Sequence, residues 1–122
     1  MPPPKLTANQ IRRVEEIQEF LKTVAHVKSL IAQLEANRAA KSMIVGNMCA
    51  TIARELSQMR QRALTAGVGT IADVAGTMSI MAARMGGLNA KVRALNDGIT
   101  SLTMQLDQAL KQASTPIDER PS

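Results

Sequence analysis

The sequence predicts an all-α protein, specifically a long antiparallel helical hairpin that packs in the manner of a coiled coil. Three observations lead to this fold class. Apolar residues recur at helical spacing along most of the chain, one glycine-containing turn lies near its middle, and no proline falls in residues 7–64. The chain is 45% hydrophobic but holds one aromatic residue, Phe20. Because aromatic rings supply the largest buried areas in thick cores, this composition favours a narrow helix–helix seam.

The first helix is expected over residues 7–64. Residues 1–6 contain three consecutive prolines and predict a disordered or polyproline-like lead. Thr7 and Gln10 then form the pattern of a capping box. The Thr7 hydroxyl can accept a hydrogen bond from the Gln10 backbone N–H, and the Gln10 side chain can reach back to the Thr7 backbone N–H. The apolar spacing is poorest in residues 36–41, which marks the most favourable place for a break.

A turn is expected over residues 65–69, because Gly67 can adopt the left-handed conformation that ends a helix. Thr70 and Asp73 read as a second capping box, which predicts a second helix over residues 70–113. Residues 7–114 therefore form one helical domain. Residues 115–122 are polar, contain Pro116 and are expected to be a flexible tail.

The second helix carries the most regular apolar pattern in the chain. Over about six heptads, every a and d position is apolar, and this regularity predicts a seam of the coiled-coil type. The pattern stays in phase across Gly86 and Gly87, which favours one continuous helix. We expect this seam to join the helix to an oligomer or partner, and its residues are Ile71, Val74, Met78, Met81, Met85, Leu88, Val92, Leu95, Ile99, Leu102 and Leu106.

A lone hairpin buries only one stripe on each helix. Apolar residues such as Ile80 and Met104 lie off the stripe, so we expect hairpins to associate into a multi-helix bundle, most simply a homodimer. Residues 7–22 outreach the second helix and would pair elsewhere. The alternative is a compact four-helix bundle with breaks near Asn37 and Gly86.

No residue pattern indicates catalysis, a metal site or a cofactor. His26, the only histidine, has no carboxylate or thiol at helical spacing, whereas a zinc site needs about four converging ligands. Cys49 is expected to be a buried apolar thiol. The spacing of Met78, Met81 and Met85 is that of core positions rather than of a copper site. We therefore expect no enzymatic activity and no small-molecule substrate.

Charge is distributed unevenly. Residues 38–93 hold eight basic and two acidic side chains, a net charge of +6, while residues 1–37 carry +1 and residues 94–122 carry −2. In a hairpin this excess gathers near the turn and would attract nucleic acid, an acidic membrane surface or an acidic protein. The candidate anion-binding patch is Arg54, Arg60, Arg62, Arg84, Lys91 and Arg93.

These patterns lead to two functional hypotheses. The first is a structural or interaction protein, a self-associating hairpin that docks another protein through apolar helix faces. The alternative is a basic helical module that binds an anionic surface, either nucleic acid or membrane. The sequence shows no signal peptide and no run of about 20 apolar residues. We therefore expect a cytoplasmic location, with signal-independent export as the open alternative.

Overall fold

The computed structural model describes residues 5–84 and 86–116 and contains four α-helices in this part of the chain. Their bounds are α1 Ala8–Ala36, α2 Ser42–Thr65, α3 Gly69–Ala83 and α4 Leu88–Ala113. The all-α fold class is confirmed. Most of the expected proline-rich lead and of the expected tail, together with seam residue Met85, lies outside the described residues.

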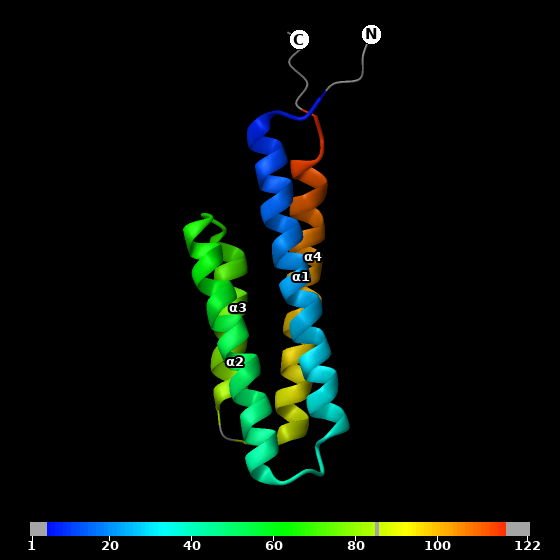
Figure 1. Cartoon of the computed structure of the whole chain (residues 1–122), viewed down its shortest axis with the longest axis vertical. Coiled ribbons are helices and arrows are strands. Elements are labelled where there is room, and N and C mark those ends of the chain that lie inside the picture. Colours follow the sequence, from blue (N-terminus) through cyan, green and yellow to red (C-terminus); the bar gives the residue numbers. More distant parts are fainter. Residues whose placement is uncertain (1–4, 85, 117–122) are drawn as a thin grey trace.

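The helices run alternately up and down and form a closed ring (Figure 1). Helix α1 packs against α2 and α4, and α3 also packs against α2 and α4, whereas the diagonal pairs make no contact within the described residues. The two continuous helices expected over 7–64 and 70–113 are therefore wrong. Each is interrupted once, and the arrangement is the alternative four-helix bundle with breaks near Asn37 and Gly86.

Both interruptions follow from local chemistry. At the end of α1, the Asn37 side chain donates to the Gln33 carbonyl at 2.7 Å, and Asn37 itself has a non-helical backbone. Between α3 and α4, Gly86 has a φ of +154°, a conformation that residues with a Cβ rarely adopt. Folding each long helix back on itself covers stripes that one extended hairpin would leave in water, and this burial favours the compact form.

The start of α1 is as expected. The Thr7 hydroxyl accepts from the Gln10 backbone N–H at 3.1 Å, and the Thr7 N–H donates to the Gln10 side chain at 2.8 Å. The capping box is therefore confirmed. The overhang expected for residues 7–22 pairs with α4 instead of another molecule, and the Gln10 side-chain amide donates to the Thr115 carbonyl at 2.8 Å.

The turn between α2 and α3 is a Schellman motif. Gly67 has a φ of +76°, as expected for a helix C-terminus. The Val68 N–H donates to the Ala63 carbonyl at 2.8 Å and the Gly67 N–H to the Leu64 carbonyl at 3.1 Å. The second capping box is wrong, because α3 begins at Gly69 with Val68 as its N-cap. Thr70 therefore lies inside the helix and does not cap it.

One apolar core runs through the bundle, and none of its buried side chains among the described residues is polar or charged. It draws on all four helices. The largest fully buried side chains are Val27, Ile31, Leu34, Ile52, Leu56, Met59, Ile71, Leu95, Leu102 and Leu106.

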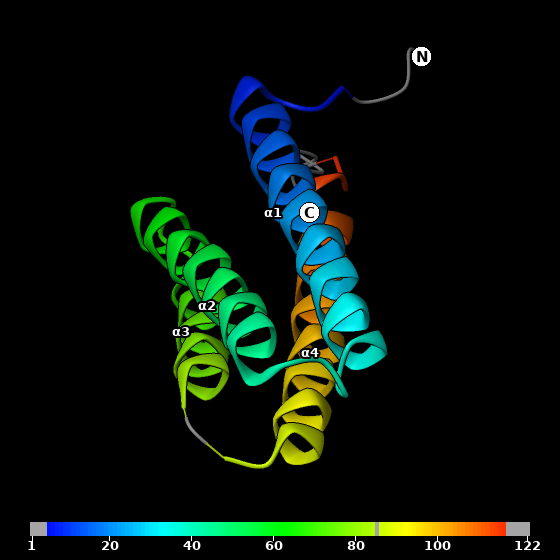
Figure 2. The ribbon, with the colours of Figure 1, turned by 60° about the horizontal axis from the view of Figure 1, so that its bottom comes forward.

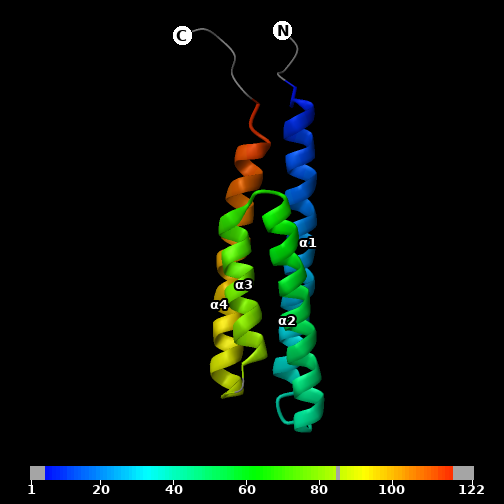
Figure 3. The ribbon, with the colours of Figure 1, turned by 90° about the vertical axis from the view of Figure 1, so that its left-hand side faces the viewer.

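The bundle consists of two helix pairs of unequal length. Helices α1 and α4 form the longer pair, and α2 and α3 form a shorter hairpin (Figure 3). Figures 1 and 2 show the tip of the hairpin standing apart from α1, whereas the pairs come together toward the opposite end. That opposite end, where the α1–α2 and α3–α4 connections lie, is called the loop end below.

Candidate anion-binding end of the bundle

The loop end of the bundle gathers basic side chains from four segments. Arg38 follows α1, Lys41 is the N-cap of α2, Arg84 is the C-cap of α3, and Lys91 and Arg93 lie in the first two turns of α4. These five residues are called the basic end. Lys91 is half-buried and the other four are exposed.

Acidic side chains are missing from the two stretches that meet here. Residues 36–54 and 74–96 contain no Asp or Glu. The ion pairs formed by described residues involve Arg13, Lys22 and Arg38, so within this part of the chain Lys41, Arg84, Lys91 and Arg93 make none. The nearest carboxylates along the chain are Glu35 and Asp97. The basic end therefore keeps most of its positive charge uncompensated.

Arg38 ties the α1–α2 connection to the rest of this end. Its Nη1 donates to Asn89 Oδ1, in the first turn of α4, at 3.1 Å. Its Nη2 lies 3.5 Å from the Glu35 carboxylate, and both side chains are about half exposed. Arg38 therefore has a structural role in closing the loop end, besides its contribution to the local charge.

The positions of Lys41 and Lys91 are not explained by helix stability. The positive end of a helix dipole favours acidic residues and disfavours cations. Yet Lys41 caps the N-terminus of α2 without a side-chain hydrogen bond, and the first turns of α2 and α4 contain no acidic residue. Two lysines at helix N-termini favour a nearby anion instead.

The structure divides the candidate patch predicted from the sequence. Arg84, Lys91 and Arg93 come together at the loop end, and Arg54 lies exposed partway along α2. Arg60 packs beside Gly76, where an added Cβ would lie 2.9 Å from Arg60 Cδ. Arg62 turns toward α1. The predicted patch of six is therefore not one surface.

Sequence reasoning left Arg38 and Lys41 out of the patch, although it counted their charge. In one unbroken helix they would lie far from the turn at Gly67. The weak apolar spacing of residues 36–41 was the signal that a connection lies there. Once that connection forms, both cations move to the end of the bundle beside α4.

A pocket of about 510 Å³ opens between α2, α3 and α4 at the loop end. Apolar side chains from all three helices line it, including Val45, Ala82 and Leu88. Arg84 and Lys91 line the same pocket. The loop end therefore combines basic groups with recessed apolar surface.

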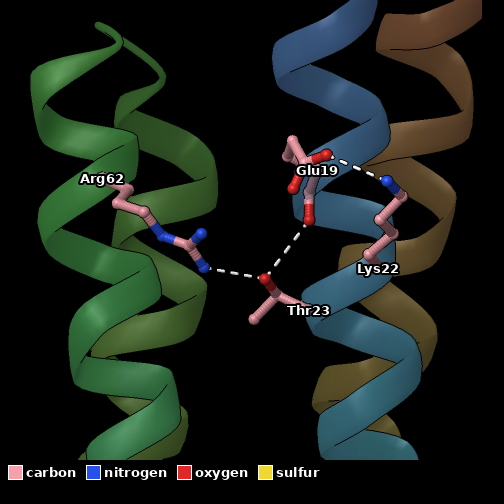
Figure 4. Close-up of polar contacts among 4 residues, drawn as sticks. All are labelled: Glu19, Lys22, Thr23 and Arg62. Atoms are coloured by element: carbon pink, nitrogen blue, oxygen red, sulfur yellow. Dashed lines mark hydrogen bonds and ion pairs between the residues drawn. The ribbon is translucent and has the colours of Figure 1, made fainter.

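A second groove, of about 490 Å³, lies between α1 and α2 near the tip of the hairpin. Arg62 spans it, donating from Nη2 to the Thr23 hydroxyl at 2.7 Å, and that hydroxyl donates to the Glu19 carbonyl at 3.2 Å (Figure 4). The Glu19 carboxylate instead accepts from Lys22 Nζ at 3.0 Å. The Arg62 guanidinium lies 5.9 Å from the centre of the Phe20 ring, within cation–π range.

The predicted seam residues face the interior of the single chain. Ile71, Met78, Val92, Leu95, Ile99, Leu102 and Leu106 are buried, and Val74, Met81 and Leu88 are half-buried. The folded bundle thus covers most of this stripe with its own helices. The role of these residues as an oligomer or partner seam stays a prediction.

The residues singled out for possible chemistry are separate from one another. His26 is exposed on α1, and Cys49 is a buried free thiol in the core. Within residues 5–84 and 86–116, no three His, Cys, Asp or Glu side chains are grouped as a metal site requires. None of the helices described combines the length and hydropathy needed to cross a bilayer.

Comparisons with protein-family models, with curated proteins and with solved structures give no match to this chain.

Proposed function

We propose that the protein is a non-enzymatic binding module that recruits a phosphate-bearing anionic surface through its basic end. The observation that carries this proposal is the convergence of Arg38, Lys41, Arg84, Lys91 and Arg93 on one end of the bundle. They come from four separate segments, and the two stretches around them contain no carboxylate.

Electrostatics supports this choice. A cluster of one sign creates a potential of several kT, which raises the local concentration of a polyanion and speeds its association. Contacts of this kind weaken steeply with salt, because binding releases counterions from the phosphates. A chain with a formal net charge of +5 is attractive as a whole to an anion, but the basic end concentrates that attraction because Glu35 is the one carboxylate that pairs with any of its five cations among the described residues.

The test compares two variants with the same net charge. The first replaces Lys41, Arg84 and Arg93 with Gln, because all three are exposed and form no ion pair within the described part of the chain. The control replaces Lys5, Arg12 and Lys111 with Gln, which are exposed near the other end. Binding is measured to duplex DNA and to phosphatidylglycerol-containing vesicles at ~50 mM salt, where phosphate attraction is strong.

We expect the first variant to lose binding to whichever anion the wild type binds, and the control to keep most of it. Equal losses in both variants would show that net charge alone drives binding. A wild type that binds neither ligand would exclude the basic end as a binding site.

Docking of a second copy or another protein through apolar surface is the second candidate. The groove between α1 and α2, with Phe20 among its lining residues, is the observation that favours it. Mass in solution by light scattering tests self-association: a monomeric mass at all accessible concentrations would remove the dimer from this proposal. The cytoplasmic location expected from the sequence also stays a prediction.

A further inference from the structure

The basic end also carries exposed apolar side chains. Met43 and Ile44 lie in the first turn of α2, two and three residues after Lys41, and are 77% and 47% exposed. Met43 is the most exposed large hydrophobic residue described. The other such residues, Ile11, Leu64, Ile80 and Met104, are spread over α1, α2, α3 and α4. Apolar and basic side chains are thus placed together at the loop end.

We infer that the surface recognised by the basic end is an anionic phospholipid bilayer, which the loop end of the bundle contacts end-on. This inference rests on the proposed function and names its partner. A bilayer interface attracts cations through its phosphates and accepts apolar side chains into the boundary between headgroups and acyl chains. A nucleic-acid duplex offers the phosphates but has no acyl-chain layer into which an exposed Met and Ile can partition.

The arrangement of the four segments fits this mode of contact. The α1–α2 connection, the start of α2, the C-cap of α3 and the start of α4 all reach the same end (Figure 2). Cations on all of them can approach one plane while the core stays packed. The pocket beside Arg84 and Lys91 continues the same combination of basic and apolar surface inward.

The strength of each contribution sets the scale of the experiment. A lysine or arginine near an anionic leaflet contributes about a fivefold factor in partition. Three neutralised cations should therefore weaken vesicle binding by about 100-fold. Two apolar side chains that enter the interface partially should together contribute about tenfold.

The decisive variant replaces Met43 and Ile44 with Ser, which keeps every charge. Its control replaces Ile11 and Met104 with Ser, two exposed apolar residues in the first turn of α1 and the second half of α4, away from the loop end. Co-sedimentation measures binding of the full chain to phosphatidylcholine vesicles with and without phosphatidylglycerol, and fluorescence anisotropy measures binding to duplex DNA. Far-UV circular dichroism checks that each variant stays helical.

We expect the Met43→Ser/Ile44→Ser variant to lose about tenfold in partition onto phosphatidylglycerol vesicles and to bind DNA as the wild type does. The control should match the wild type on both ligands. Vesicle binding equal to wild type in the Met43/Ile44 variant would overturn the bilayer inference. Tight DNA binding with no vesicle binding would do the same while leaving the basic end as an anion-binding site. If the wild type binds neither the vesicles nor the DNA, the inference and the proposed function are both wrong.

Discussion

At the scale of single residues, Gly98 marks the closest approach between α3 and α4. A Cβ added there would lie 2.6 Å from both Cγ and Sδ of Met78, which is itself buried. Cγ is close to the backbone, so Met78 would have to change its rotamer or α3 would have to move. Gly46, in α2, differs: a Cβ added there meets nothing within 4 Å.

These two glycines give a matched pair of substitutions. Gly46→Ala should raise the free energy of unfolding by about 1 kcal/mol, because alanine is the better helix former and no atom opposes it. Gly98→Ala gains the same propensity but overpacks the interface, which typically lowers stability by about 1–3 kcal/mol. Urea denaturation followed by circular dichroism measures both. A stabilised Gly98→Ala variant would contradict the close packing described.

Individual arginines also show where sequence reasoning about the site ends. The sequence shows the basic excess of residues 38–93 and the absence of Asp and Glu from residues 36–54 and 74–96. It does not give the direction in which each side chain points. Arg60 packs beside Gly76 and Arg62 crosses to α1, because the faces of α2 that carry them pack against α3 and α1 respectively. Arg38 and Lys41 join the basic end only because α1 stops at Ala36.

At the scale of helices, the first N-cap and the Gly67 turn were predictable, whereas the second N-cap and the continuity of the helices were not. The capping box at Thr7 and the turn at Gly67 depend on neighbouring residues, so local sequence suffices to predict them. The heptad pattern of residues 71–106 is equally satisfied by one long helix or by two helices in one bundle. Tertiary burial decides between these forms, and glycine at position 86 allows the backbone conformation that the bend requires.

The α3–α4 connection can be tested at Gly86. Its φ of +154° favours glycine, whereas Gly87 has a φ of −60° and a ψ of 125°, which alanine adopts readily. Gly86→Ala should lower the free energy of unfolding by about 1–3 kcal/mol through backbone strain. Gly87→Ala, the control, should stay within about 0.5 kcal/mol of the wild type.

Backbone strain in the Gly86→Ala variant should also favour the continuous α3–α4 helix that the heptad pattern permits. A straight α3–α4 helix cannot close the four-helix ring within one chain, so it would pair with a second copy by domain swapping. Light scattering should therefore show a larger mass for Gly86→Ala than for Gly87→Ala. Equal stability and equal mass in the two variants would show that the bend does not depend on glycine.

At the scale of the whole molecule, the two ends of the bundle differ in charge and in packing. The loop end holds the five cations of the basic end and the exposed side chains of Met43 and Ile44. At the other end, the hairpin tip is held to α1 by polar contacts across a groove: Arg62 to Thr23, and Arg13 Nη1 to the Ala66 carbonyl at 3.2 Å. Substitutions in these contacts should loosen the docking of one pair on the other without altering the basic end.

The contribution of the Arg62–Thr23 contact to stability can be measured by substitution. Arg62 donates one hydrogen bond to Thr23 and lies over the Phe20 ring, so Arg62→Ala should lower the free energy of unfolding by about 1 kcal/mol. A double-mutant cycle with Thr23→Ala isolates the hydrogen bond, for which we expect a coupling energy of about 0.5–1 kcal/mol.

The control is Arg54→Ala, which removes an exposed arginine from the same helix and should change stability by less than about 0.5 kcal/mol. All three variants should bind anionic ligands nearly as the wild type does, because their changes lie outside the basic end. A coupling energy near zero would mean that the Arg62–Thr23 hydrogen bond does not hold the hairpin tip, which would then depend on packing around Phe20 and on the Arg13–Ala66 contact.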